Sequence, residues 1–399
     1  MKLPRRPMPI RMKDKGFYDE HSQTQRAIIN MTLPFAQKAL SMAVLPVAPG
    51  PFVIVDYGCS EGKNSLYMVN TAVESIRRRV ESQTFNVIFN DLPQNNFNQL
   101  LQNLYGSTEG KRLIGGAENN GSRPSVLVYI SGRPFHLQVT DDQSVHFGYS
   151  SSAAHWLTEL PARAIRGHIY LAGADEKEKS NLSKIAAQDW QDFLNCRAAE
   201  LASGGKLIVT MGARLTDDEQ VPYIKGLSEL EVEHFSSTNG PSETYTTQII
   251  MDLINELIQG LVEDKKLSQA QADSLCCPIY PRNLIEVKAP LEKAPLKEKF
   301  IVEHAEIVRV ECPLFREYLR TGDKQTYAKS ASEIFRAFME PVLLAQLFGV
   351  NERRRSERLE LDGQKIIDEL FDRLRVCIQS NPEYFTFFPI HSLLVLIRK

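Results

Sequence analysis

The segment Phe52–Asn64 constrains the fold of this 399-residue chain more than any other segment. It begins with mostly apolar, β-branched residues, carries an acid at Asp56, and continues through Gly58 and Gly62 into a helical pattern. This order predicts a buried strand that turns tightly into a helix and leaves backbone N–H groups free at the helix start. Because only glycine lets the main chain come close to a ligand there, such a turn suits a nucleoside-bearing cofactor.

A second apolar stretch, Phe85–Phe89, predicts the next strand, and an acid, Asp91, follows it. A carboxylate at that position can accept hydrogen bonds from both ribose hydroxyls of a nucleoside. The glycine spacing matches neither the Gly-x-Gly-x-x-Gly pattern of dinucleotide sites nor a triphosphate-binding loop. S-adenosylmethionine, a nucleoside without phosphates, fits better, and Asp56 could then meet the cationic end of its amino-acid portion. The alternative is an ordinary α/β sheet without a ligand.

The composition excludes several classes of protein. An apolar fraction of 43% and a charged fraction of 24% are typical of globular proteins in water. The net charge of −2 argues against a nucleic-acid partner, and no apolar run approaches the roughly 18 residues that a membrane span needs. The amino terminus lacks the apolar core of a signal peptide. Six scattered cysteines without metal-ligand spacing indicate reduced thiols, so we expect a cytoplasmic protein.

Helical and strand patterns alternate along much of the chain. The predicted helices are 17–45 and 63–80, and the predicted strands are 126–130, 168–172 and 206–210. A further helix is expected to begin at Asp189, as its cap, and to end at Gly204-Gly205. This repetition predicts an α/β fold with a parallel sheet and helices on both faces.

The pattern changes between about 215 and 330, where helical stretches such as 247–261 alternate with proline-containing loops. We interpret this part as an inserted, mostly helical cap over the carboxyl edge of the sheet. The expected division is a flexible segment at 1–16, a core formed by 17–214 and 331–399, and a cap at 215–330. The last part of the core is expected to contain helices at 331–348 and 363–380 and a strand at 392–397.

Four motifs resemble one known family, the SABATH methyltransferases, which use S-adenosylmethionine to methylate carboxyl groups, or in some members ring nitrogens, of small molecules. Its first motif, Asp-x-Gly-Cys-Ser-x-Gly-x-Asn, is matched at 56–64, and its second, Asn-Asp-Leu-Pro-x-Asn-Asp-Phe-Asn, is matched at 90–98 with one change. The amino-terminal Tyr-x-x-Asn-Ser-x-x-Gln is similar to 18–25, and the substrate-side motif to 150–157. The resemblance covers about residues 17 to 397.

The resemblance implies a Rossmann-like class I methyltransferase sheet with an inserted helical cap, usually as a homodimer. It also implies a set of cofactor contacts, with Asp91 at the ribose and Leu92 beside the adenine. The cofactor-binding residues carried over from the family are Ser22, Asp56, Gly58, Asn64, Asp91, Leu92, Tyr129 and Ile130. The last two stand where the family has Ser-Phe, so this adenine contact is altered.

The substrate-binding residues implied by the resemblance are Tyr18, Gln25, Ser152, His155 and Trp156. Gln25 and Trp156 would hold the substrate carboxylate, His155 stands where the family varies between Met and His, and Ser152 replaces a tyrosine. Without the family pattern, Trp156 and His155 would be ordinary core residues and Gln25 a solvent-facing one. Some members hold magnesium through asparagines that this chain lacks; only Asp273 remains plausible, so no metal is predicted.

The predicted function is therefore methyl-ester formation on a small organic acid by in-line displacement. A carboxylate is already ionised at pH 7, so no general base is needed and the enzyme works by positioning. Gln25 and the Trp156 indole are neutral donors that can orient an oxygen without neutralising it. Three alternatives remain open: methylation of a ring nitrogen, a nicotinamide-dependent dehydrogenase, and a cofactor-binding protein without catalysis.

Overall fold

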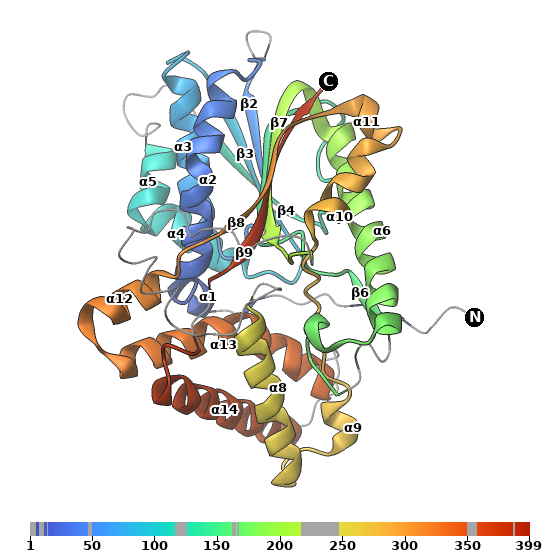
Figure 1. Cartoon of the computed structure of the whole chain (residues 1–399). Helices are drawn as coiled ribbons and strands as arrows, with labels where there is room; N and C mark the ends of the chain where they lie inside the picture. The colour runs from blue at the N-terminus through green and yellow to red at the C-terminus, as the bar shows by residue number, and fades with distance from the viewer. Residues whose placement is uncertain are drawn as a thin grey trace.

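The computed structural model describes residues 5–7, 12–13, 15–46, 50–115, 126–161, 165, 167–216, 247–348, 357–385 and 388–399. Seven strands form one sheet in the order β4-β3-β2-β5-β7-β9-β8 (Figure 1). Its parallel strands are β2 (Phe52–Tyr57), β3 (Phe85–Asp91), β4 (Val126–Gly132), β5 (Val145–Ser151) and β7 (Leu201–Gly212). β9 (Ile390–Arg398) runs antiparallel between β7 and β8 (Phe300–Arg309).

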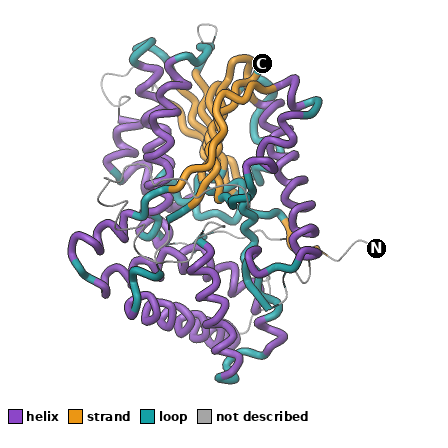
Figure 2. Tube along the Cα trace, viewed as in Figure 1, coloured by secondary structure: helices purple, strands orange, loops and turns teal. Residues whose placement is uncertain are grey.

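Helices cover both faces of this sheet (Figures 1 and 2). One face carries α2 (Gln23–Ser41), α3 (Ser65–Arg77), α4 (Phe97–Gly106) and α5 (Thr108–Ile114). The other carries α6 (Glu176–Glu200), α10 (Leu284–Lys288) and α11 (Leu296–Lys299). The apolar residues of α3 recur at spacings of three and four, so one stripe of the helix is buried against the sheet. The α/β class and the helices on both faces are therefore confirmed, and the sheet is parallel from β4 to β7 but mixed as a whole, because β9 runs antiparallel.

A separate helical layer lies beyond the end of the sheet (Figure 1). It contains α8 (Gln248–Glu263), α9 (Gln269–Ala272), α12 (Pro313–Thr321), α13 (Lys324–Phe348) and α14 (Glu357–Ser380). Side chains from all of these helices share one apolar core. The boundaries expected for a cap, 215 and 330, do not coincide with this layer, because β8 lies between them and pairs in the sheet, whereas most of α13 and all of α14 come after 330. Residues 217–246 lie outside the described part.

Three local expectations are wrong. Residues 168–172 form no strand; the Tyr170 N–H donates to the ring Nδ1 of His168, and a short 3-10 turn follows (Leu171–Gly173). Asp189 does not begin a helix but lies inside α6, whose cap is Asp175 in a capping box with Glu178. α6 also ends at Glu200, before the two glycines expected to stop it. The central strand β5 is an addition to the predicted sheet.

The amino-terminal segment is partly structured. β1 (Arg5–Pro7) pairs antiparallel with β6 (Glu159–Pro161), and α1 (Phe17–Glu20) follows. Residues 1–4, 8–11 and 14 of the segment expected to be flexible lie outside the described residues. Among the helices that are described, none is both long and apolar enough to cross a bilayer.

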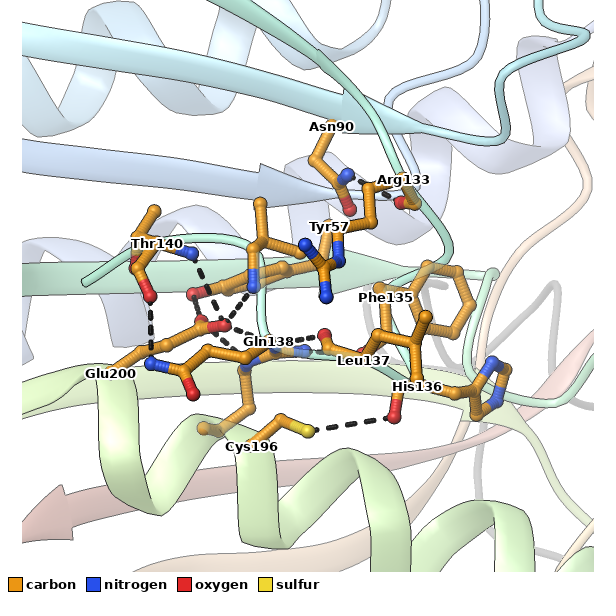
Figure 3. A network of polar contacts seen from close by, with 12 residues as sticks. Tyr57, Asn90, Arg133, Phe135, His136, Leu137, Gln138, Thr140, Cys196 and Glu200 are labelled. Atoms are coloured by element: carbon orange, nitrogen blue, oxygen red, sulfur yellow. Dashed lines mark hydrogen bonds and ion pairs between the residues drawn. The ribbon is translucent and has the colours of Figure 1, made fainter. Parts of the chain in front are cut away.

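A buried ion pair attaches the loop 133–140 to α6 (Figure 3). Arg197 and Glu200 have no solvent exposure, and the Arg197 Nη2 donates to Glu200 Oε1 at 2.7 Å. The Tyr57 hydroxyl donates to the other carboxylate oxygen at 2.6 Å. The guanidinium also donates to the carbonyl oxygens of Phe135 and Leu137, while Glu200 accepts from backbone N–H groups of the same loop. Both charges are thus paired, and the loop is held through its main chain.

Replacing Arg197 by Met should lower the free energy of unfolding by about 3–5 kcal/mol, because Glu200 would keep a buried charge without its partner. Denaturant unfolding measures this loss. The double variant Arg197→Met, Glu200→Gln should recover part of it, since it removes the unpaired charge. A single variant as stable as the parent protein would contradict the role given to this pair.

Candidate functional site

The turn after β2 has the backbone that the sequence predicts. Gly58 and Gly62 have φ values of 95° and 87°, and Ser60 between them has φ 51°. The N–H groups of Gly58 and Cys59 donate to the Asn90 carbonyl at the end of β3, at 2.8 and 3.0 Å. A Cβ at Gly58 would lie 2.4 Å from the Cβ of Ala153, which leaves room only for glycine. The turn therefore lies directly against the loop that follows β5.

Asp91 lies at this turn, at the end of the neighbouring strand. Its two carboxylate oxygens accept from the N–H of Ser60 at 2.6 Å and of Leu92 at 2.7 Å. The Asn95 amide donates to the Ser60 carbonyl at 2.7 Å. Burial raises the pKa of Asp91, and the two backbone N–H groups oppose that rise. The two strand ends thus meet, as their positions in the sequence predict.

Ser22 and Asn64 join α2 to the same turn. The Asn64 side-chain amide donates to the Ser22 hydroxyl at 2.8 Å and to its carbonyl at 3.2 Å. Neither residue lines the cavity described below. The pair therefore positions the first turn of α2, and with it Gln25, relative to the glycine turn.

Asp56 is 2% exposed and lies at the end of β2, behind the turn and away from the cavity lining. Burial raises the pKa of its carboxyl to about 7, a hydrogen bond with Ser65 lowers it, and the nearby Asp91 raises it further. This carboxyl therefore changes charge near neutral pH.

Tyr129 and Ile130 do not join the other proposed cofactor residues. They lie on β4, the edge strand, with 47% and 37% of their surface exposed, and neither lines the cavity. The loop that follows β4 lines it instead, through Pro134, Phe135, His136 and Leu137. The sequence reasoning missed these residues, although Arg197 and Glu200 hold their loop in place (Figure 3).

A cavity of about 420 Å³ begins at the glycine turn and extends under the helical layer. It brings together eight of the residues expected to bind cofactor or substrate. These are Tyr18, Gln25, Gly58, Asp91, Leu92, Ser152, His155 and Trp156. Apolar walls are added by Ile28, Ile279, Ile334, Phe335, Phe338 and Pro389. Among the described lining residues, Asp91 is the one acid and there is no lysine or arginine.

The loop 153–157 is fixed from two sides. The Leu157 N–H donates to the Pro278 carbonyl at 2.8 Å, and the Tyr280 N–H donates to the His155 carbonyl at 2.9 Å. Trp156 packs edge-on against Phe338 of α13, with ring centroids 6.2 Å apart. In the lining of the same cavity, the Gln25 side-chain oxygen is buried without a hydrogen-bond partner among the described residues. An unpaired buried amide oxygen on a cavity wall is typical of a ligand-binding position.

His155 lies in the cavity lining as a neutral ring. Its Nδ1 accepts from the Gly212 N–H at 2.7 Å, so the ring proton is on Nε2. Burial lowers the pKa of His155 well below its usual value, and His391 and Arg282 lower it further. His391 of β9 is a second buried histidine on the wall, and the sequence reasoning missed it.

The described residues contain no group of three or more His, Cys, Asp or Glu side chains placed to hold a metal ion. Asp273, the one candidate ligand from the sequence, follows α9 and accepts from Gln269, away from the cavity lining.

The family model described as "SAM dependent carboxyl methyltransferase" matches residues 10–399. The chain belongs to this family, the SABATH methyltransferases. Three similar proteins are a benzoic acid/salicylic acid carboxyl methyltransferase of Petunia hybrida, the salicylate carboxymethyltransferase of Clarkia breweri and a probable caffeine synthase of Camellia sinensis. The Petunia protein is 28% identical over 82% of this chain and 84% of its own length. The Clarkia protein is 25% identical over 96% of this chain and 95% of its own length. The Camellia protein is 25% identical over 92% of this chain and 90% of its own length.

Among solved structures, loganic acid methyltransferase with SAH is similar, with a TM-score of 0.71 and 21% identity over 98% of this chain and 99% of the other. This likeness supports the fold: the sheet is the Rossmann-like class I methyltransferase sheet. The SABATH chain is thus an S-adenosyl-L-methionine-dependent methyltransferase of a small molecule.

Gly58→Ala should abolish binding of S-adenosylhomocysteine in a calorimetric titration, because the new Cβ would displace the turn from Ala153. Gly167→Ala is the matched control. Gly167 also has a positive φ, 66°, but a Cβ there meets nothing within 4 Å. It should cost only about 1–2 kcal/mol of stability and leave binding intact. Equal binding by the two variants would contradict the close-approach argument.

Asp56→Asn should change how stability depends on pH. The folded-state pKa of Asp56, about 7, lies above its unfolded value, so the stability that its protonated form contributes is present below pH 4 and is lost as the pH rises through 7. Asparagine resembles the neutral acid and lacks this loss, which is on the order of 4 kcal/mol. Unfolding of the cofactor-free protein between pH 4.5 and 8 measures the difference. Parallel profiles for the two proteins would show that Asp56 ionises normally.

Proposed function

We propose that this SABATH methyltransferase forms the methyl ester of a small organic acid. The observation that carries the proposal is the composition of one cavity. Gly58, Asp91 and Leu92 line one part of it, and the neutral donors Gln25 and Trp156 line another. A carboxylate held by neutral donors keeps the charge that makes it a nucleophile, whereas lysine or arginine would reduce it.

The cofactor residues fit a nucleoside at the glycine turn. Asp91 would accept hydrogen bonds from the ribose hydroxyls, since its carboxylate faces the cavity, and Leu92 would lie beside the adenine. The Ser60 hydroxyl, on the same wall, is buried without a partner among the described residues and is available to a ligand. Ser22 and Asn64 would act by shaping the turn. The roles carried over for Asp56, Tyr129 and Ile130 stay predictions, because these three lie outside the cavity lining.

S-adenosylmethionine supplies an electrophilic methyl group on a sulfonium when it is bound. The chain's own part is then to place one carboxylate oxygen in line with that carbon and to exclude water. Gln25 and Trp156 would orient the carboxylate. Tyr18 would form part of the cavity wall where the acid and the cofactor meet. Ile334, Phe335 and Phe338 close the cavity on its apolar side, which removes competing water.

Methylation of a ring nitrogen is the second candidate, favoured by His155 on the cavity wall and by the similarity to a probable caffeine synthase. A nitrogen that carries a proton must lose it during transfer. Burial lowers the pKa values of His155 and His391, the latter to about 3, so both are weak bases. A carboxylate needs no base, and for this reason we favour ester formation.

Two further properties belong to the proposal. A homodimer is expected from the family resemblance. A cytoplasmic location is expected from the reduced thiols that the sequence indicates, and none of the six cysteines forms a disulfide in the structure.

With labelled S-adenosylmethionine and a panel of small acids, the product label should be released by mild base, as esters are hydrolysed and N-methyl groups are not. Trp156→Phe should lower kcat/KM for the acid by about 10-fold or more, through loss of one hydrogen bond. S-adenosylhomocysteine should bind this variant as it binds the parent. Base-stable label would favour nitrogen methylation, and cofactor binding without transfer to any acceptor would favour a non-catalytic protein.

A further inference from the structure

Two histidines from distant parts of the chain meet on one wall of the cavity. His155 comes from the loop after β5 and His391 from the start of β9, and their ring centroids are 6.4 Å apart. The pairing of β7 with β9 brings them together, because His391 lies opposite Gly212, whose N–H binds the His155 ring. Figure 1 shows β9 inserted into the sheet beside β7.

His391 has hydrogen-bonding capacity that the described fold does not use. Its side chain is buried, with the residue 4% exposed, and its Nδ1 has no partner among the described residues. Its Nε2 lies 3.4 Å from the Ser152 hydroxyl, which is long for a hydrogen bond. Burying an unpaired ring nitrogen costs free energy that an apolar side chain at this position would avoid. A polar ligand that pairs with the nitrogen is therefore the simplest explanation for a histidine here.

Ser152 belongs to the same wall and is fixed in place. Its backbone N–H donates to the Thr210 carbonyl at 2.8 Å, and its φ is 53°. The hydroxyl can donate or accept, and the Nε2 of His391 lies 3.4 Å from it. The lining of the same cavity also contains the apolar residues Ile334, Phe335 and Pro389. Ser152 and His391 thus form a polar pair in a lining that also carries apolar side chains.

We propose that Ser152 and His391 bind a hydroxyl group of the methyl acceptor, separate from the carboxylate that is methylated. This assignment rests on the proposed function, because it names the substrate class for the same cavity: hydroxy acids with an otherwise apolar skeleton. A hydroxyl both donates and accepts, so it can pair with either tautomer of His391 and with the serine. A charged group fits less well, since the described lining offers no lysine or arginine to pair with it.

Matched pairs of acids test the proposal. Hydroxybenzoic acids against benzoic acid, and hydroxycyclohexanecarboxylic acids against the parent acid, differ in one hydroxyl. For at least one positional isomer, the parent protein should prefer the hydroxy acid by about 10-fold or more in kcat/KM. In His391→Leu this ratio should fall to within about 3-fold, through a loss on the hydroxy acid alone. His391→Gln should keep part of the preference, and Ser152→Ala should lose part of it.

His304→Leu is the matched control, because His304 lies on the neighbouring strand β8, partly exposed and beside Glu306, outside the cavity. The ratio of kcat/KM for the hydroxy acid to that for the parent acid should be the same in His304→Leu as in the parent protein. If the parent protein shows no preference in any pair, or if His391→Leu and Ser152→Ala both keep it, the assignment is overturned. Ser152→Ala and His391→Gln keep the test decisive if His391→Leu does not fold.

Titration of the same acids into the complex with S-adenosylhomocysteine separates this assignment from the proposed function. A hydroxyl preference in binding that His391→Leu removes supports the assignment even if the label proves base-stable and ester formation fails. Conversely, base-labile label with no hydroxyl preference supports ester formation and overturns the assignment.

Discussion

The contact between Gly58 and Ala153 links the two halves of the site. The glycine turn follows β2 and the substrate-side loop follows β5, and these strands are neighbours in the sheet. Because a single added Cβ at Gly58 would come within 2.4 Å of Ala153, the distance between turn and loop has little freedom. The positions of Asp91 on one side and of Trp156 on the other are therefore fixed relative to each other. Methyl transfer depends on such a fixed distance more than on any acid or base.

The chemistry of the cavity agrees with this dependence on position. Its polar side chains are two amides, an indole, hydroxyls and three imidazoles, with Asp91 as the described acid. Neutral donors position a carboxylate oxygen of the acceptor by hydrogen bonds and leave its negative charge available for the reaction. The same burial that lowers the pKa of His391 to about 3 keeps it in this neutral set at any physiological pH.

Much of the fold and part of the site could be predicted from the sequence. Strands β2 and β3 could be predicted because each is a short apolar run that ends in an acid and a turn. β5 could not, because Val145–Ser151 contains a histidine, a glycine and two serines, and only its place between β2 and β7 makes it a buried strand. His391 could not be found either, since it lies 239 positions from Ser152 and meets it only through the pairing of β7 with β9. Tyr129 and Ile130 lie on an edge strand, which the residue pattern does not reveal.

Arg197 and Glu200 hold the loop 133–140 through its main chain, so the residues that anchor the loop are not the ones that face the cavity. The pair binds main-chain oxygens and N–H groups, so it makes no demand on the side chains of His136 or Leu137 that face the cavity. Those two positions can be varied in a library while the scaffold beneath them stays intact. They offer a route by which a catalyst of this kind could be redirected to acceptors of a different outline.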